Sequence, residues 1–170
     1  CAKDRKNEYG TAEALDYKGR GAKAGLYHLF VMEELLPFLR LQFNIVNIKE
    51  MAFAGFSLGG LSALDIVWNH PSLFSKAAIF SGSLWWRDKD HEELDFDEDR
   101  DRIMHRSIRE GEFKPGLKFF FEVGTLDETN DRNNNGIIDS IDDTLSLITE
   151  LSQKGYDPIK DIKYLELSNG

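Results

Sequence analysis

Hydrophobic residues recur at helical spacing in some segments of the chain and form short continuous runs in others. Helical spacing predicts helices over residues 22–42, 58–69, 100–110 and 140–154. Continuous apolar runs bounded by turn residues predict strands over residues 49–55, 77–80, 118–123 and 161–167. Helices and strands therefore alternate along the chain. This order indicates an α/β fold, a mostly parallel sheet with helices on both faces.

Polar segments separate these elements. Residues 1–20 contain several glycines and show no clean period, which predicts a long surface loop. The acidic run at residues 95–101 is typical of a solvated loop or helix start. Pro37 predicts a kink or an early end in the first helix, because proline lacks the N–H that a helix interior needs. No low-complexity linker divides the chain, so residues 1–170 are expected to form a single domain.

The amino-acid composition limits the classes of molecule that this chain is expected to bind. The net charge of −9 and the isoelectric point near 4.9 argue against nucleic acid and against anionic membranes. No apolar run approaches the roughly 20 residues of a membrane span. Cys1 is the one cysteine, which excludes an intrachain disulfide and a thiolate zinc site.

Residues 55–60 (GFSLGG) lie between the strand predicted at 49–55 and the helix predicted at 58–69. The order strand, G-x-S-x-G, helix predicts a nucleophile elbow, in which Ser57 adopts a strained conformation and presents its hydroxyl above the sheet. Gly55 and Gly59 have no side chains to collide across this turn. The backbone N–H of Leu58 then points to the position where an oxyanion would form. A glycine-rich turn with an incidental serine is the alternative.

Two carboxylates and two tryptophans follow predicted strands. A serine nucleophile needs a histidine base, which a carboxylate orients, and that acid follows a later strand in α/β-hydrolases. Asp127 and Glu128 follow the strand at 118–123 directly, and either could instead cap the loop. Trp85 and Trp86 follow the strand at 77–80, at the strand end where open α/β sheets bind ligands. These tryptophans are candidates for a wall of the substrate pocket, with packing in the core as the alternative.

The four histidines all precede Asp127 in the chain, whereas the usual order of the triad is serine, acid, histidine. His70 ends the helix that starts after Ser57, which places it roughly 20 Å from that serine at about 1.5 Å per residue. His28 lies on the first predicted helix, and His91 and His105 flank the acidic run and are expected at the surface. None of the four is a good candidate for the base.

Residues 131–142 follow the spacing of an EF-hand calcium loop. The candidate ligands are five oxygen-bearing side chains and one backbone carbonyl: Asp131, Asn133, Asn135, Ile137, Asp139 and Asp142. Gly136 supplies the sharp turn at the sixth position. The loop departs from the pattern in having aspartate rather than glutamate at the last position and a strand exit before it. The sequence therefore predicts a structural calcium that pins the loop next to Asp127, with an Asn- and Asp-rich surface turn as the alternative.

Several motifs together resemble a known family. They are EYG at 8–10, Tyr17, GRG at 19–21, ELLP at 34–37, GFSLGG at 55–60, FSGS at 80–83 and VGTLD at 123–127. Over nearly the whole chain this set is similar to the Putative esterase family of α/β-hydrolases, which includes enterobactin esterases, feruloyl esterases, S-formylglutathione hydrolases and mycolyltransferases. The most specific parts are the GFSLGG turn and the GT-x-D sequence after the strand at 118–123.

The resemblance implies an α/β-hydrolase fold and an activity on a small-molecule or carbohydrate ester, with no cofactor for catalysis. The feruloyl esterase branch favours Asp127 as the acid, whereas the mycolyltransferase branch resembles Glu128. The histidine of the family follows the last strand, which implies a base within a few residues beyond Gly170. Cys1 to Arg5 are typical of a strand exit. We therefore expect an incomplete domain without its N-terminal strands, its second oxyanion donor and its histidine segment.

The leading hypothesis is a serine ester hydrolase that works through an acyl-enzyme. Transfer of the acyl group to an alcohol would instead give an acyltransferase, and the sequence does not distinguish the two. A catalytically inactive hydrolase-like binding domain is a further alternative, because no histidine stands in the expected position. A calcium-dependent module of the dockerin type is disfavoured, since it needs two loops of about 12 residues and only one is present.

Overall fold

The computed structural model describes residues 3–168, and Cys1, Ala2, Asn169 and Gly170 lie outside the described residues. Four parallel strands form one sheet in the order β1-β2-β3-β4. The strands are β1 (Ala52–Phe56), β2 (Lys76–Phe80), β3 (Lys118–Gly124) and β4 (Ile162–Leu167). Each strand overlaps a predicted one, so the predicted parallel sheet is confirmed.

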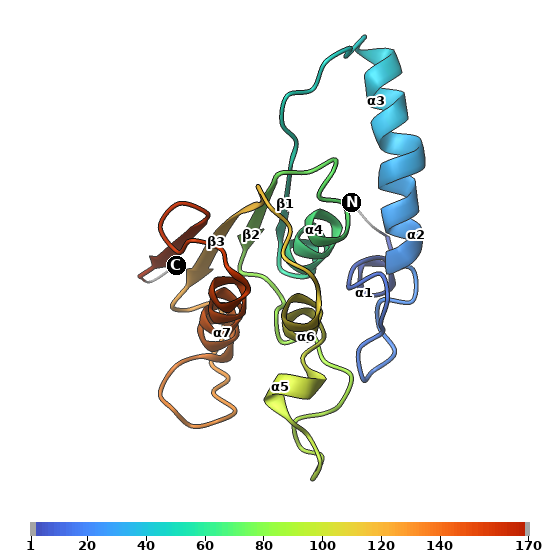
Figure 1. Cartoon of the computed structure of the whole chain (residues 1–170). Coiled ribbons are helices and arrows are strands. Elements are labelled where there is room, and N and C mark those ends of the chain that lie inside the picture. Colours follow the sequence, from blue (N-terminus) through green and yellow to red (C-terminus); the bar gives the residue numbers. More distant parts are fainter. Residues whose placement is uncertain (1–2, 169–170) are drawn as a thin grey trace.

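The helices alternate with the strands, also as predicted. They are α1 (Arg5–Glu8), α2 (Ala24–Leu29), α3 (Leu36–Gln42), α4 (Leu58–Asn69), α5 (Glu98–Asp101), α6 (Ile103–Glu110) and α7 (Asp139–Lys154), with a π-helical segment, η1 (Phe30–Leu35), between α2 and α3. Figure 1 shows α2 and α3 as one long rod along the side of the molecule, outside α4. The helix predicted at 100–110 is two helices, because Arg102 adopts an extended conformation with φ −78° and ψ 109°.

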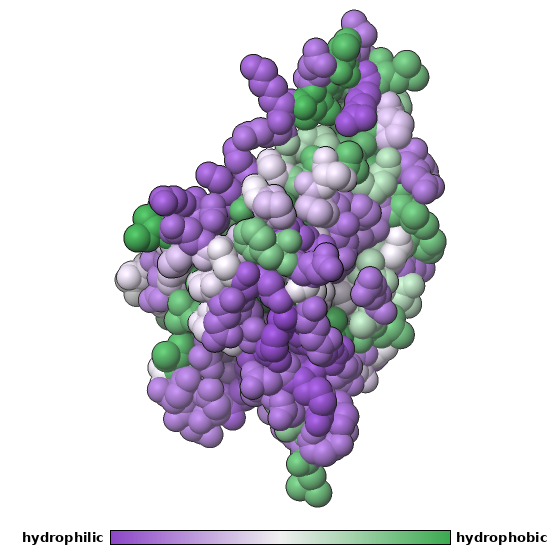
Figure 2. Space-filling view, in the orientation of Figure 1, coloured by the Kyte–Doolittle hydropathy of each residue, from purple (hydrophilic) through white to green (hydrophobic). Residues whose placement is uncertain are grey.

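Pro37 does not end the first helix, and a π-helical segment precedes it. The helix continues to Gln42, and the π-helical segment η1 directly precedes the turn that holds Pro37. Proline has no N–H to donate to the carbonyl four residues earlier. The wider turn of a π-helix changes which backbone N–H and C=O groups form hydrogen bonds there. Beyond Pro37 the rod leaves the body of the molecule. Leu41 is 86% exposed, and Figure 2 shows apolar side chains at this end of α3.

One face of the sheet carries the core. Helix α4 packs on β1 and β2, and α7 packs on β3. Alternate residues of the central strands, such as Ile79 and Phe121, are buried beneath these helices. Their neighbours on the opposite face, such as Phe80 and Phe120, are only half-buried, and Phe56 on β1 is 63% exposed. Within residues 3–168, therefore, the predicted helical cover is present on one face of the sheet.

The N-terminal segment is docked on α4 rather than free in solvent. The backbone N–H of Gly10 donates to Ser62 Oγ at 3.0 Å, and the N–H of Ala12 donates to Asp65 Oδ2 at 2.8 Å. His28 Nε2 lies 3.0 Å from the same carboxylate oxygen of Asp65, and both side chains are buried. Two side chains of one helix thus hold the loop predicted at 1–20. Among the described residues no helix has the length and apolarity needed to cross a membrane.

Candidate functional site

Ser57 occupies the junction of β1 and α4. Its backbone has φ 56° and ψ −123°, a region that residues with a side chain rarely adopt. The N–H of Ser57 donates to the carbonyl of Phe80 at 3.0 Å, and its own carbonyl accepts from Gly60 N at 2.9 Å. The chain thus reverses from strand to helix in a single residue. The predicted strain at Ser57 is present.

The glycines around Ser57 differ in how much space a side chain would find. A Cβ on Gly55 would lie 2.0 Å from the carbonyl oxygen of Gly59, an impossible contact with backbone. A Cβ on Gly60 would lie 3.0 Å from the carbonyl of Gly55 and 3.1 Å from Ile79 Cγ2. A Cβ on Gly59 would meet nothing within 4 Å. A side chain is therefore sterically excluded at Gly55, as expected. At Gly59 there is room for one, and the close contacts are instead at Gly60.

A cavity of about 220 Å³ opens at the carboxyl edge of the sheet above Ser57. Its lining comes from residues that follow β1, β2 and β3 and from the start of α7: Ser57, Ser81, Gly82, Ser83, Trp85, Asp127, Glu128 and Ser140, together with Phe56 at the end of β1. The hydroxyls of Ser57 and Ser83 lie 3.4 Å apart, and the N–H of Ser83 donates to the carbonyl of Ser57 at 3.1 Å. Residues from three strand ends thus converge on one small space.

A second cavity, of about 350 Å³, adjoins the first. It shares Trp85 and Glu128 with the first cavity, and its other walls are Arg87, His91, Asn130, Asp131, Arg132 and Asp139. The guanidinium of Arg20 lies 4.9 Å from the ring centre of Trp85 and supports that ring. Trp86 is fully buried, because the backbone at Gly10 and Gly21 packs directly on its ring. Of the two predicted pocket tryptophans, Trp85 lines both cavities and Trp86 is instead a core residue.

The two candidate acids both line the cavity at Ser57 but differ in environment. Asp127 is exposed, and its Oδ2 accepts a hydrogen bond from the N–H of Gly124 at 2.9 Å. Glu128 is half-buried, and its Oε2 accepts from the amide of Asn130 at 3.1 Å. Its other oxygen, Oε1, is buried and has no hydrogen-bond partner among the described residues.

Of the four histidines, His105 departs from the expected position. It is completely buried rather than at the surface, whereas His91 is exposed, as expected, and lines the second cavity. His28 is buried against Asp65, and His70 lies beside it with ring centres 5.8 Å apart. None of these four, all within the described residues, lines the cavity at Ser57.

A family model describes nearly all of this chain. Residues 2–157 match the model of the family named Putative esterase. The chain belongs to this esterase family. A comparison with curated protein sequences gave no match.

Solved structures similar to this chain have the same fold. The enterobactin esterase FES from Shigella flexneri is 24% identical, with a TM-score of 0.57 over 85% of this chain and 33% of that one. The siderophore hydrolase EstB from Aspergillus nidulans is 19% identical, with a TM-score of 0.63 over 98% and 58%. A ferulic acid esterase is 15% identical, with a TM-score of 0.56 over 84% and 53%. The chain thus spans between a third and three fifths of the length of these proteins. The predicted α/β-hydrolase-like fold is confirmed.

The structure gives no support to the predicted calcium site. Among the described residues there is no group of three or more His, Cys, Asp or Glu side chains able to hold a metal. The carboxylate of Asp139 accepts from the backbone N–H of Arg132 at 2.9 Å and pairs with its guanidinium at 3.3 Å. Asp142 accepts from the amide of Asn133 at 2.8 Å, and Asp131 accepts from backbone N–H groups of the loop. The side chains of Asp131, Asn133, Asp139 and Asp142 are therefore engaged with protein groups.

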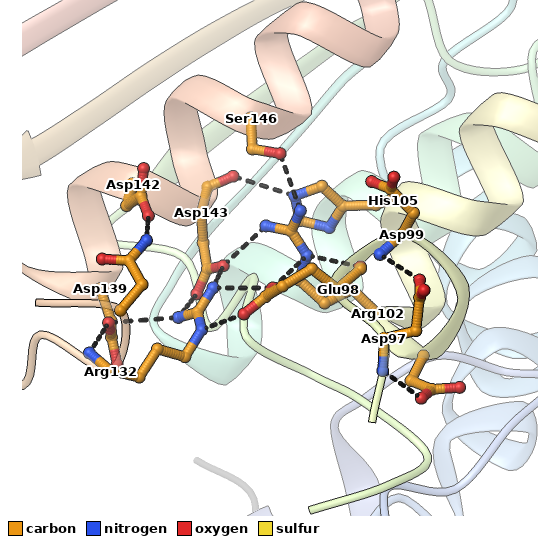
Figure 3. A network of polar contacts seen from close by, with 12 residues as sticks. Asp97, Glu98, Asp99, Arg102, His105, Arg132, Asp139, Asp142, Asp143 and Ser146 are labelled. Atoms are coloured by element: carbon orange, nitrogen blue, oxygen red, sulfur yellow. Dashed lines mark hydrogen bonds and ion pairs between the residues drawn. The ribbon is translucent and has the colours of Figure 1, made fainter. Parts of the chain in front are cut away.

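Arg132, the second residue of the predicted calcium loop, carries a buried positive charge. Its side chain is only 6% exposed and donates to Glu98 at 2.6 and 3.1 Å and to Asp143 at 3.1 Å (Figure 3). Arg102 donates to Asp143 at 2.9 Å and to Ser146 at 2.8 Å. These contacts join α5, the N-cap of α6, α7 and the loop between β3 and α7. We call this set of buried charges the Arg132 network.

Burial sets the protonation states inside the Arg132 network. Burial, with the charge of Arg102 added, lowers the pKa of His105 well below its ordinary value of 6.5. The ring is therefore neutral at neutral pH, and its Nε2–H donates to the carbonyl of Asp143 at 3.0 Å. Burial alone would raise the pKa of Glu98, but the hydrogen bond and charge of Arg132 hold that pKa below the ordinary value. Glu98 is thus an anion that keeps Arg132 in place.

Sequence reasoning missed Ser83 and Arg132. Ser83 lies in the FSGS motif, whose place after a strand was visible, but its approach to Ser57 depends on the pairing of β1 with β2. Arg132 is the second residue of the apparent calcium loop. A positively charged residue at this position was the only feature of the sequence that pointed to a buried guanidinium here.

Proposed function

We propose that this esterase-family chain provides the serine nucleophile and the acid of a carboxylic-ester hydrolase. The observation that carries the proposal is Ser57 itself. It has a strained backbone at a strand-to-helix turn, and it lines a cavity together with both candidate acids. The esterases among the structural neighbours support ester hydrolysis in general.

In the proposed reaction, Ser57 Oγ attacks the ester carbonyl carbon while its proton passes to a histidine. The first N–H groups of α4 have no acceptor within the helix, and that of Leu58 would donate to the oxyanion. The alcohol leaves with the proton from the histidine, and an acyl-serine remains. A water molecule, activated by the same histidine, then hydrolyses the acyl-serine and restores Ser57.

The histidine would come from outside the 170 residues, beyond Gly170. Support for this comes from the described histidines, none of which lines the cavity at Ser57. The chain by itself is then expected to be inactive, and a longer polypeptide that includes the histidine is expected to be active. A 170-residue chain with full activity would contradict this part of the proposal.

Asp127 is the proposed acid. Its carboxylate is fixed by the N–H of Gly124 at the end of β3 and remains accessible from the cavity, as a partner of an incoming histidine must be. Glu128 is the alternative. A pair of isosteric variants decides between them, because loss of the acid in a triad lowers kcat by about ten-thousandfold. We expect that loss for Asp127→Asn in the full-length polypeptide, with Glu128→Gln far less affected.

The test of the proposed function is hydrolysis of p-nitrophenyl acetate by the full-length polypeptide, beside its Ser57→Ala variant. We expect the variant to lose at least about a thousandfold in kcat. Equal rates would remove Ser57 from the reaction. Adding a small alcohol and measuring the transferred ester distinguishes an acyltransferase from a hydrolase, since both would form the same acyl-serine.

A further inference from the structure

Ser83 follows β2 and lies directly against Ser57, which follows β1. Its backbone N–H donates to the carbonyl of Ser57 at 3.1 Å, and the two hydroxyl oxygens lie 3.4 Å apart. The N–H of Ser57 donates in turn to the carbonyl of Phe80, the last residue of β2. The turn at residues 80–83 therefore holds the peptide groups on both sides of Ser57 and also places a hydroxyl beside the Ser57 hydroxyl.

This turn needs an unusual backbone to bring Ser83 to that place. Ser81 has φ 44°, in the left-handed region that residues with a side chain rarely adopt. A Cβ on Gly82 would lie 2.4 Å from Cγ2 of the buried Ile79, so the turn has no room for a side chain there. The N–H of Ser81 donates to the carbonyl of Glu122 on β3 at 2.8 Å, which fixes the turn to the next strand. Strained backbone of this kind clusters at functional sites, where the surrounding structure holds it.

The Ser83 hydroxyl has Ser57 Oγ as its hydrogen-bond partner among the described residues. Ser83 is only 5% exposed, so its hydroxyl has little access to water as a replacement. Each serine hydroxyl carries one proton and can also accept a hydrogen bond. When the Ser57 proton points to a base, Ser57 Oγ can only accept from Ser83. The direction of the hydrogen bond in a reacting site is therefore from Ser83 to Ser57.

The separation of the two hydroxyl oxygens is that of a site without substrate. At 3.4 Å it is longer than the roughly 2.7–2.8 Å usual between hydroxyl groups. Hydrogen bonds between reacting groups are often long in the free enzyme and shorten when the substrate is bound. A donor on this side of Ser57 Oγ fixes the oxygen for attack and leaves its own proton free for the base. Small errors in the position of a reacting atom lower the rate strongly.

We propose that Ser83 is a positioning residue for the nucleophile: its hydroxyl donates to Ser57 Oγ and holds that oxygen in the orientation from which it attacks the ester carbonyl. The proposal rests on the proposed function, because it takes Ser57 as the nucleophile. The proton of Ser57 passes to the histidine, and the proton of Ser83 stays on Ser83 throughout. Ser83 therefore forms and breaks no covalent bond and acts only through Ser57.

The burst of p-nitrophenolate from p-nitrophenyl acetate tests this role, because the burst follows acylation of Ser57 in the full-length polypeptide. Its dependence on substrate concentration separates substrate affinity from the acylation rate constant. Ser83→Ala adds no atom and keeps the backbone hydrogen bond to Ser57. We expect this variant to acylate about tenfold more slowly than the wild type, with substrate affinity unchanged.

Two further variants separate positioning from packing. Ser83→Thr retains a hydroxyl and is expected to recover most of the lost acylation rate. Ser72→Ala, at an exposed serine in the turn after α4, is the control and should leave the burst unchanged. Urea denaturation shows whether each variant is folded, and the alanine variant decides alone if the threonine methyl group is not accommodated.

The outcomes distinguish this proposal from the proposed function. A folded Ser83→Ala variant that acylates at the wild-type rate would overturn the role of Ser83 and leave Ser57 as the proposed nucleophile. Weaker substrate affinity with an unchanged acylation rate would also overturn it, since Ser83 would then only line the cavity. A folded Ser83→Thr variant as slow as Ser83→Ala would contradict the need for a hydroxyl. An undiminished burst in Ser57→Ala would instead end both proposals.

Discussion

The turn at Ser57 and the loop at residues 125–138 follow strands of the same sheet, but different forces hold them. Backbone packing holds the turn, where Gly55 and Gly60 allow strand and helix to touch. Buried charges hold the loop, through Arg132 and its partners Glu98 and Asp143. The first kind of constraint is local in the chain, and the second joins residues up to 34 positions apart.

This difference predicts that a single methyl group added at Gly55 is strongly destabilising. In Gly55→Ala the new Cβ would lie 2.0 Å from the Gly59 carbonyl oxygen, so strand and helix must separate. We expect a loss of about 5 kcal/mol in the free energy of unfolding, at the upper end for overpacked sites. Urea denaturation measures this loss.

Gly59→Ala is the matched control, because a Cβ there meets nothing within 4 Å. It lies in the same turn and should change the free energy of unfolding by less than about 1 kcal/mol. Similar losses in the two variants would show that flexibility rather than steric contact requires the glycines.

The loop is expected to depend on Arg132. Arg132→Ala removes one of the two guanidinium groups that pair with Glu98 and Asp143 and leaves Arg102 as the other. Removal of one member of a buried ion pair costs about 3–5 kcal/mol. Lys160→Ala is the control, since that side chain is 80% exposed and its ion pair contributes little. Thermal and urea unfolding of both variants compare them. A stable Arg132→Ala variant would show that the ion pairs do not hold the loop.

The Arg132 network also predicts a dependence on pH. His105 is neutral in the folded protein because its pKa is lowered, so below about pH 6.5 the unfolded chain binds a proton that the folded one does not. Stability contributed by neutral His105 is complete above that pH and falls by about 1.4 kcal/mol per pH unit as the pH decreases below it. His70, whose pKa burial also lowers, adds to the same trend.

Unfolding free energies measured between neutral pH and about pH 5 test this dependence. His105→Gln should have a shallower slope than the wild type, and His70→Gln should separate the second contribution. A slope that is the same in wild type and His105→Gln would mean that His105 protonates equally in both states.

Calcium is expected to have the smallest effect. A ligand that binds only the folded state raises the unfolding temperature, in proportion to its affinity. Because Asp139 is paired with Arg132 and Asp142 with Asn133, millimolar calcium should leave the unfolding temperature unchanged. Magnesium at equal ionic strength is the control. A calcium-specific increase would show that the loop binds calcium in spite of these contacts.

The sequence predicted those features whose causes are local. The boundaries of α4 (Leu58–Asn69) agree with the predicted helix, and the glycine spacing indicated the strained residue Ser57. The EF-hand spacing of residues 131–142 was also local, but it could not reveal that Asp139 pairs with an arginine of the same loop. The burial of His105 could not be predicted either, because it depends on the packing of α6 against α7.

The candidate site also combines features with local causes and features that depend on long-range packing. Asp127 and Glu128 were found from their place after a strand, and both line the cavity at Ser57. Trp85 and Trp86 are neighbours with the same local context, yet one lines the cavities and the other is core. The backbone at Gly10 and Gly21 packs on Trp86, and that contact joins segments far apart in the chain.

The most direct test of the central claim is to find which residue reacts with a fluorophosphonate, a reagent that modifies activated serines. Ser57 and Ser83 have hydroxyls 3.4 Å apart, so the full-length polypeptide is labelled beside its Ser57→Ala and Ser83→Ala variants, and mass spectrometry locates the label. We predict a single label on Ser57, absent in Ser57→Ala and retained in Ser83→Ala. A label on Ser83, or one that persists in Ser57→Ala, would contradict the assignment of Ser57 as the nucleophile.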